Sequence, residues 1–480
     1  MDPTFLPAVR LAELTRRREI GCLELLDHYI ARVARLDGPI NAVVVHDFDR
    51  ARDRAHALDQ STDRSAPLFG VPMTVKESFD VAGLPSTRGH LAAKDHRAEH
   101  SSIAVRRLEA AGVVIFGKTN VPVDLADWQS YNPVYGTTTN PWNRDHTPGG
   151  SSGGSAAALA AGMTGLEMGS DIGGSIRNPA HYNGIYGLKP SWGVVPSRGH
   201  IPGPPGSLVE TDVNCGGPLA RSLEDLRTAL TVVAGPVPED AAAWHLHLDP
   251  GPEIDNMTSV RVATVFAEGS DLLPVARDVR ASLDGFASGL AGAGVQVDAV
   301  PLPVPLADGL RSWQELVLPI IGTGLSDQDF AAFAELEAVP GDDPMLTVGR
   351  ALASRYRSWA RANANRQRQR AAWATLFQHY EVVLAPVMPT TAFPHDTDRP
   401  ITDRVLDIDG TAVPHLIAMA WCGAIGPVLL PVVTLPIGPT SAGLPVGIQV
   451  IGPYLSDLRL LQIAELLEAA AGTAFTPPPD

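Results

Sequence analysis

The chain has 480 residues, of which 45% are hydrophobic and 19% charged, a composition typical of globular proteins. Its net charge of −16 argues against nucleic acid or an anionic membrane surface as a partner, because both attract clusters of lysine and arginine. Three scattered cysteines give no disulfide framework, and the first residues lack the pattern of a secretory signal. The longest apolar run is too short to span a membrane. We therefore expect a cytoplasmic protein.

Hydrophobic periodicity in the first half of the chain predicts alternating helices and strands. The predicted helices cover 6–18, 22–36, 50–59, 152–161 and a short stretch from 176 onward. The predicted strands cover 40–45, 71–76, 113–116 and 163–168. In the strand at 71–76, alternation places Val71, Met73 and Val75 on one side and Lys76 on the other.

The second half begins with a stretch rich in Pro, Asp and Ala at 235–256, which we interpret as a surface connection. Further strands are predicted at 260–265, 295–300, 382–385, 432–435 and 446–451. Further helices are predicted at 273–293, 350–380 and 458–471. The helix at 350–380 carries many arginines, which we interpret as a solvated helix face. Alternating helices and strands predict an α/β fold.

Two glycine-rich segments hold the candidate chemistry. The run 149–155 reads GGSSGGS and the run 169–179 reads GSDIGGSIRNP, which places Ser151 and Ser175 in turns where the backbone can approach a reacting group. The first run formally matches a nucleophile elbow around Ser152, but a loop precedes it where that motif needs a strand. It also lacks the Gly-Lys-Ser/Thr that closes a phosphate-binding loop. Two hydroxyls, a lysine and free backbone N–H groups predict an amide-bond hydrolase.

The candidate base is Lys76. A serine hydroxyl is a weak nucleophile unless a neighbour removes its proton, and a lysine can do so only when it is neutral. Desolvation on an apolar strand supplies the required shift. Lys118 and Lys189 are alternative bases, but each follows a glycine-bearing loop and is interpreted as structural. Asp171 and Arg177 flank the second glycine turn and are predicted to pair and brace it, with solvation of Arg177 as the alternative.

These segments resemble the amidase signature family. The matching pieces span nearly the whole chain and include 117–122, 136–143, 149–155, 169–179, 187–191, 217–222, 443–449 and the strand around Lys76. The resemblance implies a triad in which Ser175 is the nucleophile, Ser151 is a bridging serine after a cis peptide bond, and Lys76 is the base. It also implies an oxyanion hole formed by backbone N–H groups, namely those of Ile172, Gly173 and Gly174 alongside Ser175.

The resemblance further implies one α/β domain of the amidase signature type, with a twisted mixed β-sheet covered by helices on both faces. Within it we expect four parts in chain order: a helical N-terminal segment at 1–62, the signature core at 63–235, a variable cap or substrate region at 236–400, and a return to the sheet at 401–480.

The family lines the acyl side of its cleft with the segment after Lys-Thr-Asn, so Leu125 and Trp128 are candidate pocket residues here. Glu167 stands where the family has a small residue. We interpret it as a surface-facing strand residue, or else as the mark of a subgroup with a different wall near the nucleophile. Together with the stiff loop at 196–206, it is similar to a bacterial branch that includes aryl-amide and urethane-cleaving amidases.

The expected function is therefore hydrolysis of the carbon–nitrogen bond of a small neutral amide or anilide through an acyl-enzyme on Ser175. Alternatives are urethane (carbamate) or ester hydrolysis by the same triad, the amidase subunit of a tRNA-dependent amidotransferase, and a non-catalytic binding protein. No metal or organic cofactor is implied, because the sequence has no metal or dinucleotide motif. The expected partners are the substrate and water, without nucleic acid or membrane, and monomer and homodimer both remain open.

Overall fold

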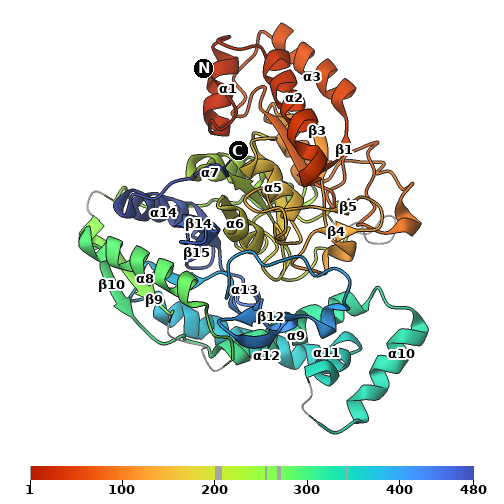
Figure 1. The fold of residues 1–480 in the computed structure, drawn as a ribbon, viewed down its shortest axis with the longest axis vertical. Coiled ribbons are helices and arrows are strands. Elements are labelled where there is room, and N and C mark those ends of the chain that lie inside the picture. Colours follow the sequence, from red (N-terminus) through yellow and green to blue (C-terminus); the bar gives the residue numbers. More distant parts are fainter. Residues whose placement is uncertain (1, 201–207, 255–256, 267–271, 342–343, 480) are drawn as a thin grey trace.

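A mixed β-sheet runs through the molecule in the computed structural model, which describes residues 2–200, 208–254, 257–266, 272–341 and 344–479 (Figure 1). In spatial order its 11 strands among these residues are β1 (Val43–His46), β3 (Val114–Thr119), β2 (Pro72–Lys76), β6 (Glu167–Asp171), β8 (Cys215–Ala220), β7 (Tyr186–Lys189), β14 (Val432–Pro439), β15 (Pro445–Ile451), β11 (Val382–Pro386), β9 (Arg261–Thr264) and β10 (Gln296–Ala299). Strand β2 pairs in parallel with β3 and β6, and β9 pairs in parallel with β10 and β11, while the other pairs are antiparallel.

Helices cover both faces of this sheet, as predicted. Alternation along β8 shows the two faces: Leu219 packs with residues of α5 and α6, whereas Ala220 lies in the cluster that contains α7. The described helices are α1 (Ala8–Arg16), α2 (Cys22–Ile40), α3 (Phe48–Gln60), α4 (Ile103–Ala110), α5 (Gly153–Ala160), α6 (Arg177–Asn183), α7 (Leu223–Val233), α8 (Arg277–Gly292), α9 (Leu306–Gly322), α10 (Asp327–Glu335), α11 (Pro344–Leu352), α12 (Tyr356–Leu376), α13 (Ala420–Gly423) and α14 (Asp457–Ala471).

Helix α5 fixes the first glycine-rich segment against the sheet. All eight of its residues are buried, and every one except Leu159 is glycine, alanine or serine. A Cβ on Gly154 would overlap the backbone nitrogen of Asn120, so only glycine lets the helix lie this close to the end of β3. The small side chains therefore bring the turn that precedes α5 directly onto the parallel strands.

The strand predicted at 163–168 is wrong in its bounds, because the pairing that defines β6 begins only at Glu167. Residues 163–166 instead form the turn after α5, where the N–H of Met163 donates to Ala158 and that of Gly165 donates to Pro72. The strand consequently extends into the second glycine-rich segment, so Ser170 and Asp171 lie on the sheet rather than in a loop.

The single helix predicted at 350–380 is also wrong, because α11 ends at Leu352 and α12 begins at Tyr356. The interruption lets the end of α11 approach α9 so closely that a Cβ on Gly322 would overlap the Leu352 carbonyl oxygen. The arginines of α12 are not all solvated either: Arg366 is 6% exposed and its Nη1 lies 2.8 Å from Asp212 Oδ2.

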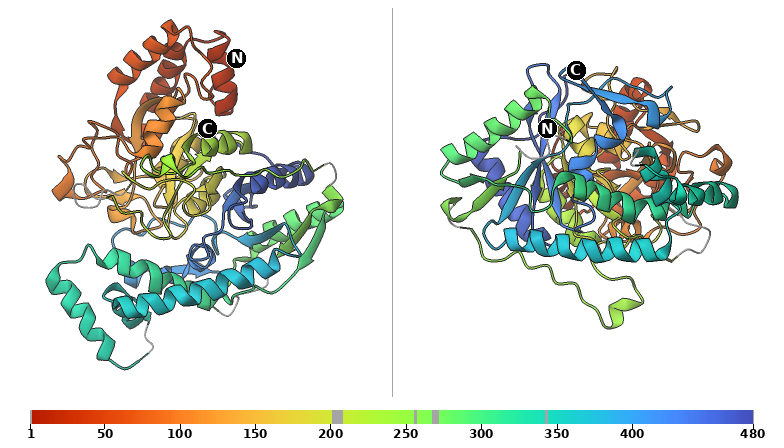
Figure 2. Two further views of the ribbon diagram at one scale, coloured as in Figure 1. Left: turned by 180° about the vertical axis from the view of Figure 1, so that it is seen from behind. Right: turned by 90° about the horizontal axis from the view of Figure 1, so that it is seen from below.

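The N-terminal helices α1–α3 and the helices α9–α12 lie at opposite ends of the molecule (Figure 2). A small hairpin of β12 (Val405–Ile408) and β13 (Thr411–Pro414) and the short pair β4 (Tyr131–Asn132) and β5 (Gly136–Thr137) supplement the main sheet. The predicted connection at 235–256 contains one short turn, at Asp240–Ala242, within its described part. No helix in the described ranges has the length and apolar character that crossing a bilayer requires.

Candidate active site

Lys76 lies at the end of β2 and is completely buried. Its Nζ donates hydrogen bonds to the Ser151 hydroxyl at 2.7 Å and to the Ser170 hydroxyl at 2.9 Å. Ser151 follows a cis peptide bond with Gly150, as the resemblance implied. The lysine and the predicted bridging serine are thus within direct proton-transfer distance.

The environment of Lys76 favours its uncharged form. Burial lowers the pKa of Lys76 from 10.5 to about 7, although the carboxyl groups of Asp171 and Glu167 raise this pKa in opposition. At neutral pH a large share of Lys76 is therefore a free amine. A neutral amine 2.7 Å from a hydroxyl oxygen can accept the hydroxyl proton as a general base.

Ser175 lies in the turn between β6 and α6, and it is the most exposed of the three predicted triad residues. Its exposed fraction is 7%, compared with 1% for Ser151 and 0% for Lys76. The two serine turns are joined through the backbone, where the N–H of Ser152 donates to the Ser175 carbonyl at 3.2 Å. Among the described residues, no hydrogen bond connects the hydroxyls of Ser151 and Ser175. Lys76 is therefore hydrogen-bonded to Ser151, while Ser175 is held next to this pair through the backbone.

Asp171 and Arg177 form a buried ion pair around the turn that holds Ser175. Arg177 donates from Nε to Asp171 Oδ2 at 2.9 Å and from Nη2 to Oδ1 at 2.8 Å, and both side chains are fully buried. The guanidinium also donates to the Cys422 carbonyl and to Gln449 Oε1. Arg177 is therefore not solvated, and it ties the turn to the C-terminal part of the sheet.

The predicted oxyanion donors differ in availability. The N–H of Gly174 donates to Asp171 Oδ1 at 2.8 Å, which contradicts its prediction as a free donor. The physical reason is that a buried carboxylate with several acceptor positions collects the N–H groups around it, including that of Ile176. The N–H groups of Ile172, Gly173 and Ser175 have no acceptor among the described residues and remain available.

Glu167 is fully buried, so its interpretation as a surface-facing residue is wrong. Strand β6 is an interior strand, and its parallel pairing with β2 sets Glu167 opposite Thr74, whose hydroxyl donates to Glu167 Oε1. Burial raises the pKa of the Glu167 carboxyl from 4.5 to about 8, and the hydrogen bond from Thr74 together with nearby polar groups such as the Ser155 hydroxyl limits this rise.

The two candidate pocket residues occupy different positions. Trp128 is buried, and its backbone packs on the serine turn: a Cβ on Gly150 would lie 3.0 Å from the Trp128 carbonyl carbon. Its ring centroid lies 5.1 Å from that of His415. Leu125 ends the short helical turn η2 (Val123–Leu125), is half-buried, and donates its N–H to Pro122 rather than contacting the serine turns by a hydrogen bond.

Only the first part of the predicted loop at 196–206 falls within the described residues, and 201–206 lie outside them. His200 is buried next to the segment that follows Lys76. Its Nε2 lies 3.0 Å from the Ser78 hydroxyl, and Asn214 donates to its Nδ1 at 3.2 Å. The beginning of this loop is thus held close to the lysine.

Three neighbours of the site were not predicted. Ser170, which hydrogen-bonds Lys76, could have been found because it stands inside the second glycine-rich motif. Trp313 of α9 and Met419 before α13 had no local signal. Trp313 donates from its indole nitrogen to the Ile172 carbonyl at 2.7 Å, and a Cβ on Gly173 would lie 2.8 Å from Met419 Cε. Both side chains come from the C-terminal half of the chain and pack against the turn at 172–174.

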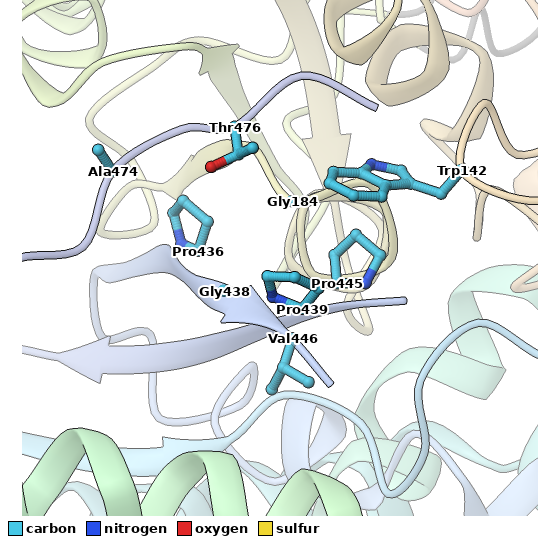
Figure 3. Close-up of a pocket in the computed structure, with 9 residues that line it drawn as sticks. All are labelled: Trp142, Gly184, Pro436, Gly438, Pro439, Pro445, Val446, Ala474 and Thr476. Carbon is cyan, nitrogen blue, oxygen red and sulfur yellow. The ribbon is translucent and has the colours of Figure 1, made fainter. Parts of the chain in front are cut away.

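A separate small pocket lies against the last residues of the chain (Figure 3). It is lined by Trp142, Gly184, Pro436, Gly438, Pro439, Pro445, Val446, Ala474 and Thr476. None of these residues ionises in water, and none is a candidate catalytic residue. This pocket therefore offers no ionisable group for acid–base chemistry.

Comparison with known proteins decides the family. The family model described as Amidase matches residues 24–461. The chain belongs to the amidase signature family. It is 32% identical to an indoleacetamide hydrolase of Bradyrhizobium diazoefficiens, over 97% of this chain and 86% of that protein. It is 31% identical to a glutamyl-tRNA(Gln) amidotransferase component of Deinococcus radiodurans, over 99% of both.

Solved structures agree with this membership. A bacterial aryl acylamidase of the amidase signature family superposes with a TM-score of 0.81 at 25% identity, covering 98% of this chain and 97% of the other. The amidase fold predicted from the sequence is therefore confirmed, and the chain is an amidase-family hydrolase.

Proposed function

We propose that this amidase hydrolyses the carbon–nitrogen bond of a small neutral amide or anilide through an acyl-enzyme on Ser175. The observation that carries the proposal is the buried Lys76 amine, with a pKa of about 7, hydrogen-bonded at 2.7 Å to Ser151. An unreactive amide needs both a nucleophile stripped of its proton and a group that returns a proton to the leaving amine. A desolvated lysine can do both near neutral pH.

The reaction begins when Ser151 passes its proton to Lys76 and takes the proton of Ser175, whose oxygen attacks the carbonyl carbon. The N–H groups of Ile172, Gly173 and Ser175 stabilise the negative oxygen of the tetrahedral intermediate, while Gly174 stays bound to Asp171. The proton returns from Lys76 through Ser151 to the leaving nitrogen, and the C–N bond breaks. Water then hydrolyses the ester on Ser175 by the same relay.

The walls of the site favour an apolar or aromatic substrate. The side chains of Trp313 and Met419 lie against Gly173, whereas Trp128 lies against Gly150 on the other serine turn through its backbone, with its ring beside His415. Trp128 and Met419 are buried and Trp313 is half-buried. The similar proteins named above include a hydrolase of indoleacetamide and an aryl acylamidase, and both names denote amides that carry an aromatic group. We therefore propose an aryl-substituted amide or an anilide as the substrate class.

The test is a panel of one acyl group presented as a primary amide, a p-nitroanilide, a carbamate and an ester, with wild type and Ser175→Ala. We expect turnover of the amide and anilide by the purified protein alone, and none above background by the folded Ser175→Ala variant. Faster turnover of the carbamate than of every amide would establish the urethane alternative instead. Undiminished amide hydrolysis by Ser175→Ala would overturn the proposed nucleophile.

A second candidate is the amidase component of a tRNA-dependent amidotransferase, because the Deinococcus relative matches over 99% of both chains. Such a component would release ammonia from glutamine and depend on partner subunits. Glutamine turnover that requires added partner subunits, without anilide turnover by the chain alone, would favour this function.

A further inference from the structure

Glu167 is a buried acid that the proposed relay does not use. Its Oε1 accepts a hydrogen bond from the Thr74 hydroxyl, and its Oε2 is buried without any hydrogen-bond partner among the described residues. An unpartnered buried oxygen is far more costly on a carboxylate than on a carboxylic acid. No described arginine or lysine forms an ion pair with it. The site therefore favours the neutral acid.

The sheet register places this acid in the same layer as Lys76. Thr74 pairs with Glu167 across the parallel strands, and Lys76 stands two residues further along β2, on the same face as Thr74. On the other side of β2, Lys76 pairs with Thr119, whose hydroxyl lies 2.8 Å from that of Ser155 in α5. The carboxyl group of Glu167 and the amine of Lys76 thus lie in one buried polar layer next to α5.

The other charged or titratable groups around this layer are already neutralised or neutral. Asp171 reaches Lys76 from β6, but its charge is balanced by Arg177 of α6. His200 approaches from the loop before 201, where burial and the charge of Lys76 hold the pKa of the imidazole well below 6.5. From β8, the residue that pairs with Glu167 is the apolar Leu219. Of the two carboxyl groups that raise the pKa of Lys76, Glu167 is therefore the one whose charge can change.

We propose that Glu167 is a positioning residue that controls how readily Lys76 gives up its proton: the neutral acid leaves Lys76 free to be an amine, and the carboxylate favours the ammonium. The proposal rests on Lys76 being the base of the proposed function. The carboxyl group raises the pKa of Lys76, and its own pKa of about 8 lies close enough for the two protonation equilibria to overlap. Removing the acid should move the onset of activity to lower pH.

The test measures inactivation by an alkyl fluorophosphonate, which forms a Ser–O–P bond on Ser175, releases fluoride and needs no amide substrate. Its second-order rate is followed from pH 5.5 to 9.5 for wild type, Glu167→Gln and Glu468→Gln. Glutamine keeps the shape of Glu167 but cannot ionise. Glu468, on α14, is the matched control because its carboxyl also has a raised pKa and also accepts a hydrogen bond from one hydroxyl, that of Tyr186.

The acid limb is the part of the pH profile in which the inactivation rate rises with pH toward its plateau. We expect the acid limb of Glu167→Gln to lie about half a pH unit or more below that of wild type. At pH 6 the inactivation rate of the variant, relative to its own plateau, should therefore be about threefold higher than that of wild type. The Glu468→Gln profile should superimpose on wild type. An acid limb of Glu167→Gln that coincides with wild type or moves to higher pH, whatever its plateau, overturns the proposal, since a purely structural role changes the plateau alone.

Two further variants keep the result unambiguous. Thr74→Val removes the hydroxyl that donates to Glu167 Oε1, and losing this donor favours the neutral form of Glu167. The acid limb of Thr74→Val should therefore also move to lower pH, and an unmoved limb overturns the proposal. Lys76→Ala tests the foundation. If labelling of Ser175 does not slow in Lys76→Ala, both the proposed relay and this inference fail. If it slows but the limbs of wild type and Glu167→Gln coincide, the inference alone fails.

Discussion

Replacing the proposed base should make the protein more stable while abolishing its activity. Lys76 has a pKa of about 7 in the folded protein in place of 10.5, which corresponds to about 5 kcal/mol at 1.36 kcal/mol for each pKa unit. Lys76→Met removes this cost and keeps the length of the side chain. It also removes two hydrogen bonds, to Ser151 and Ser170, each worth about 1 kcal/mol. The expected net gain is about 2–3 kcal/mol.

The sign of the pH dependence follows from proton binding. Below pH 7 the lysine is charged in both the folded and the unfolded chain, so folding carries the full cost of burying the ammonium. Between pH 7 and 10.5 the unfolded chain binds more protons, so the stability of wild type rises with pH and the advantage of Lys76→Met shrinks. Because the two lost hydrogen bonds still count against the variant, its advantage should vanish at about pH 9, and above 10.5 Lys76→Met should be about 2 kcal/mol less stable than wild type.

The assay is urea unfolding followed by circular dichroism at pH 6 and pH 9, with amide turnover measured alongside. Lys118→Met is the matched control: Lys118 is equally buried, burial lowers its pKa to about 8, and it donates to Pro85 and Ser86. We expect Lys118→Met to show a smaller gain and to keep its activity. A Lys76→Met variant less stable than wild type at pH 6, or one with equal gains at both pH values, would show that burying the Lys76 ammonium does not carry this cost.

Four other substitutions test the surrounding site. Arg177→Met should lower the free energy of unfolding by about 3–5 kcal/mol because it leaves the Asp171 carboxylate buried and unpaired, and Asp171→Asn should recover part of this loss in the double variant, as measured in urea. Ser151→Ala should reduce kcat by orders of magnitude for amides and less for activated esters, because the leaving groups of activated esters need less protonation. Equal losses on amides and esters would argue against a proton relay through Ser151. Trp313→Ala should lower kcat/KM about tenfold or more for an anilide while changing that for a primary amide much less, and an equal fall on both would remove Trp313 from substrate recognition.

The features that depend on residues close together in the chain could be predicted from the sequence. Alternation predicted the strand that ends at Lys76, and small residues predicted the helix at α5 after the first glycine-rich turn. The spacing of Asp171 and Arg177 predicted a pair that the structure contains. Each of these is a local pattern, because periodicity and chain geometry within about ten residues fix which side chains share a face.

The contacts that those faces make with distant segments could not be predicted in this way. The burial of Glu167 depends on β6 pairing with β2 and being covered by α5, and no local pattern encodes that neighbourhood. Arg177 donates to Gln449 and to the Cys422 carbonyl, both near the C-terminal end of the chain. Trp313 of α9 donates to the Ile172 carbonyl. The N–H of Gly174 donates to the Asp171 carboxylate, which Arg177 holds in place. Such contacts follow from packing between distant segments, where each group takes the nearest partner that the fold supplies.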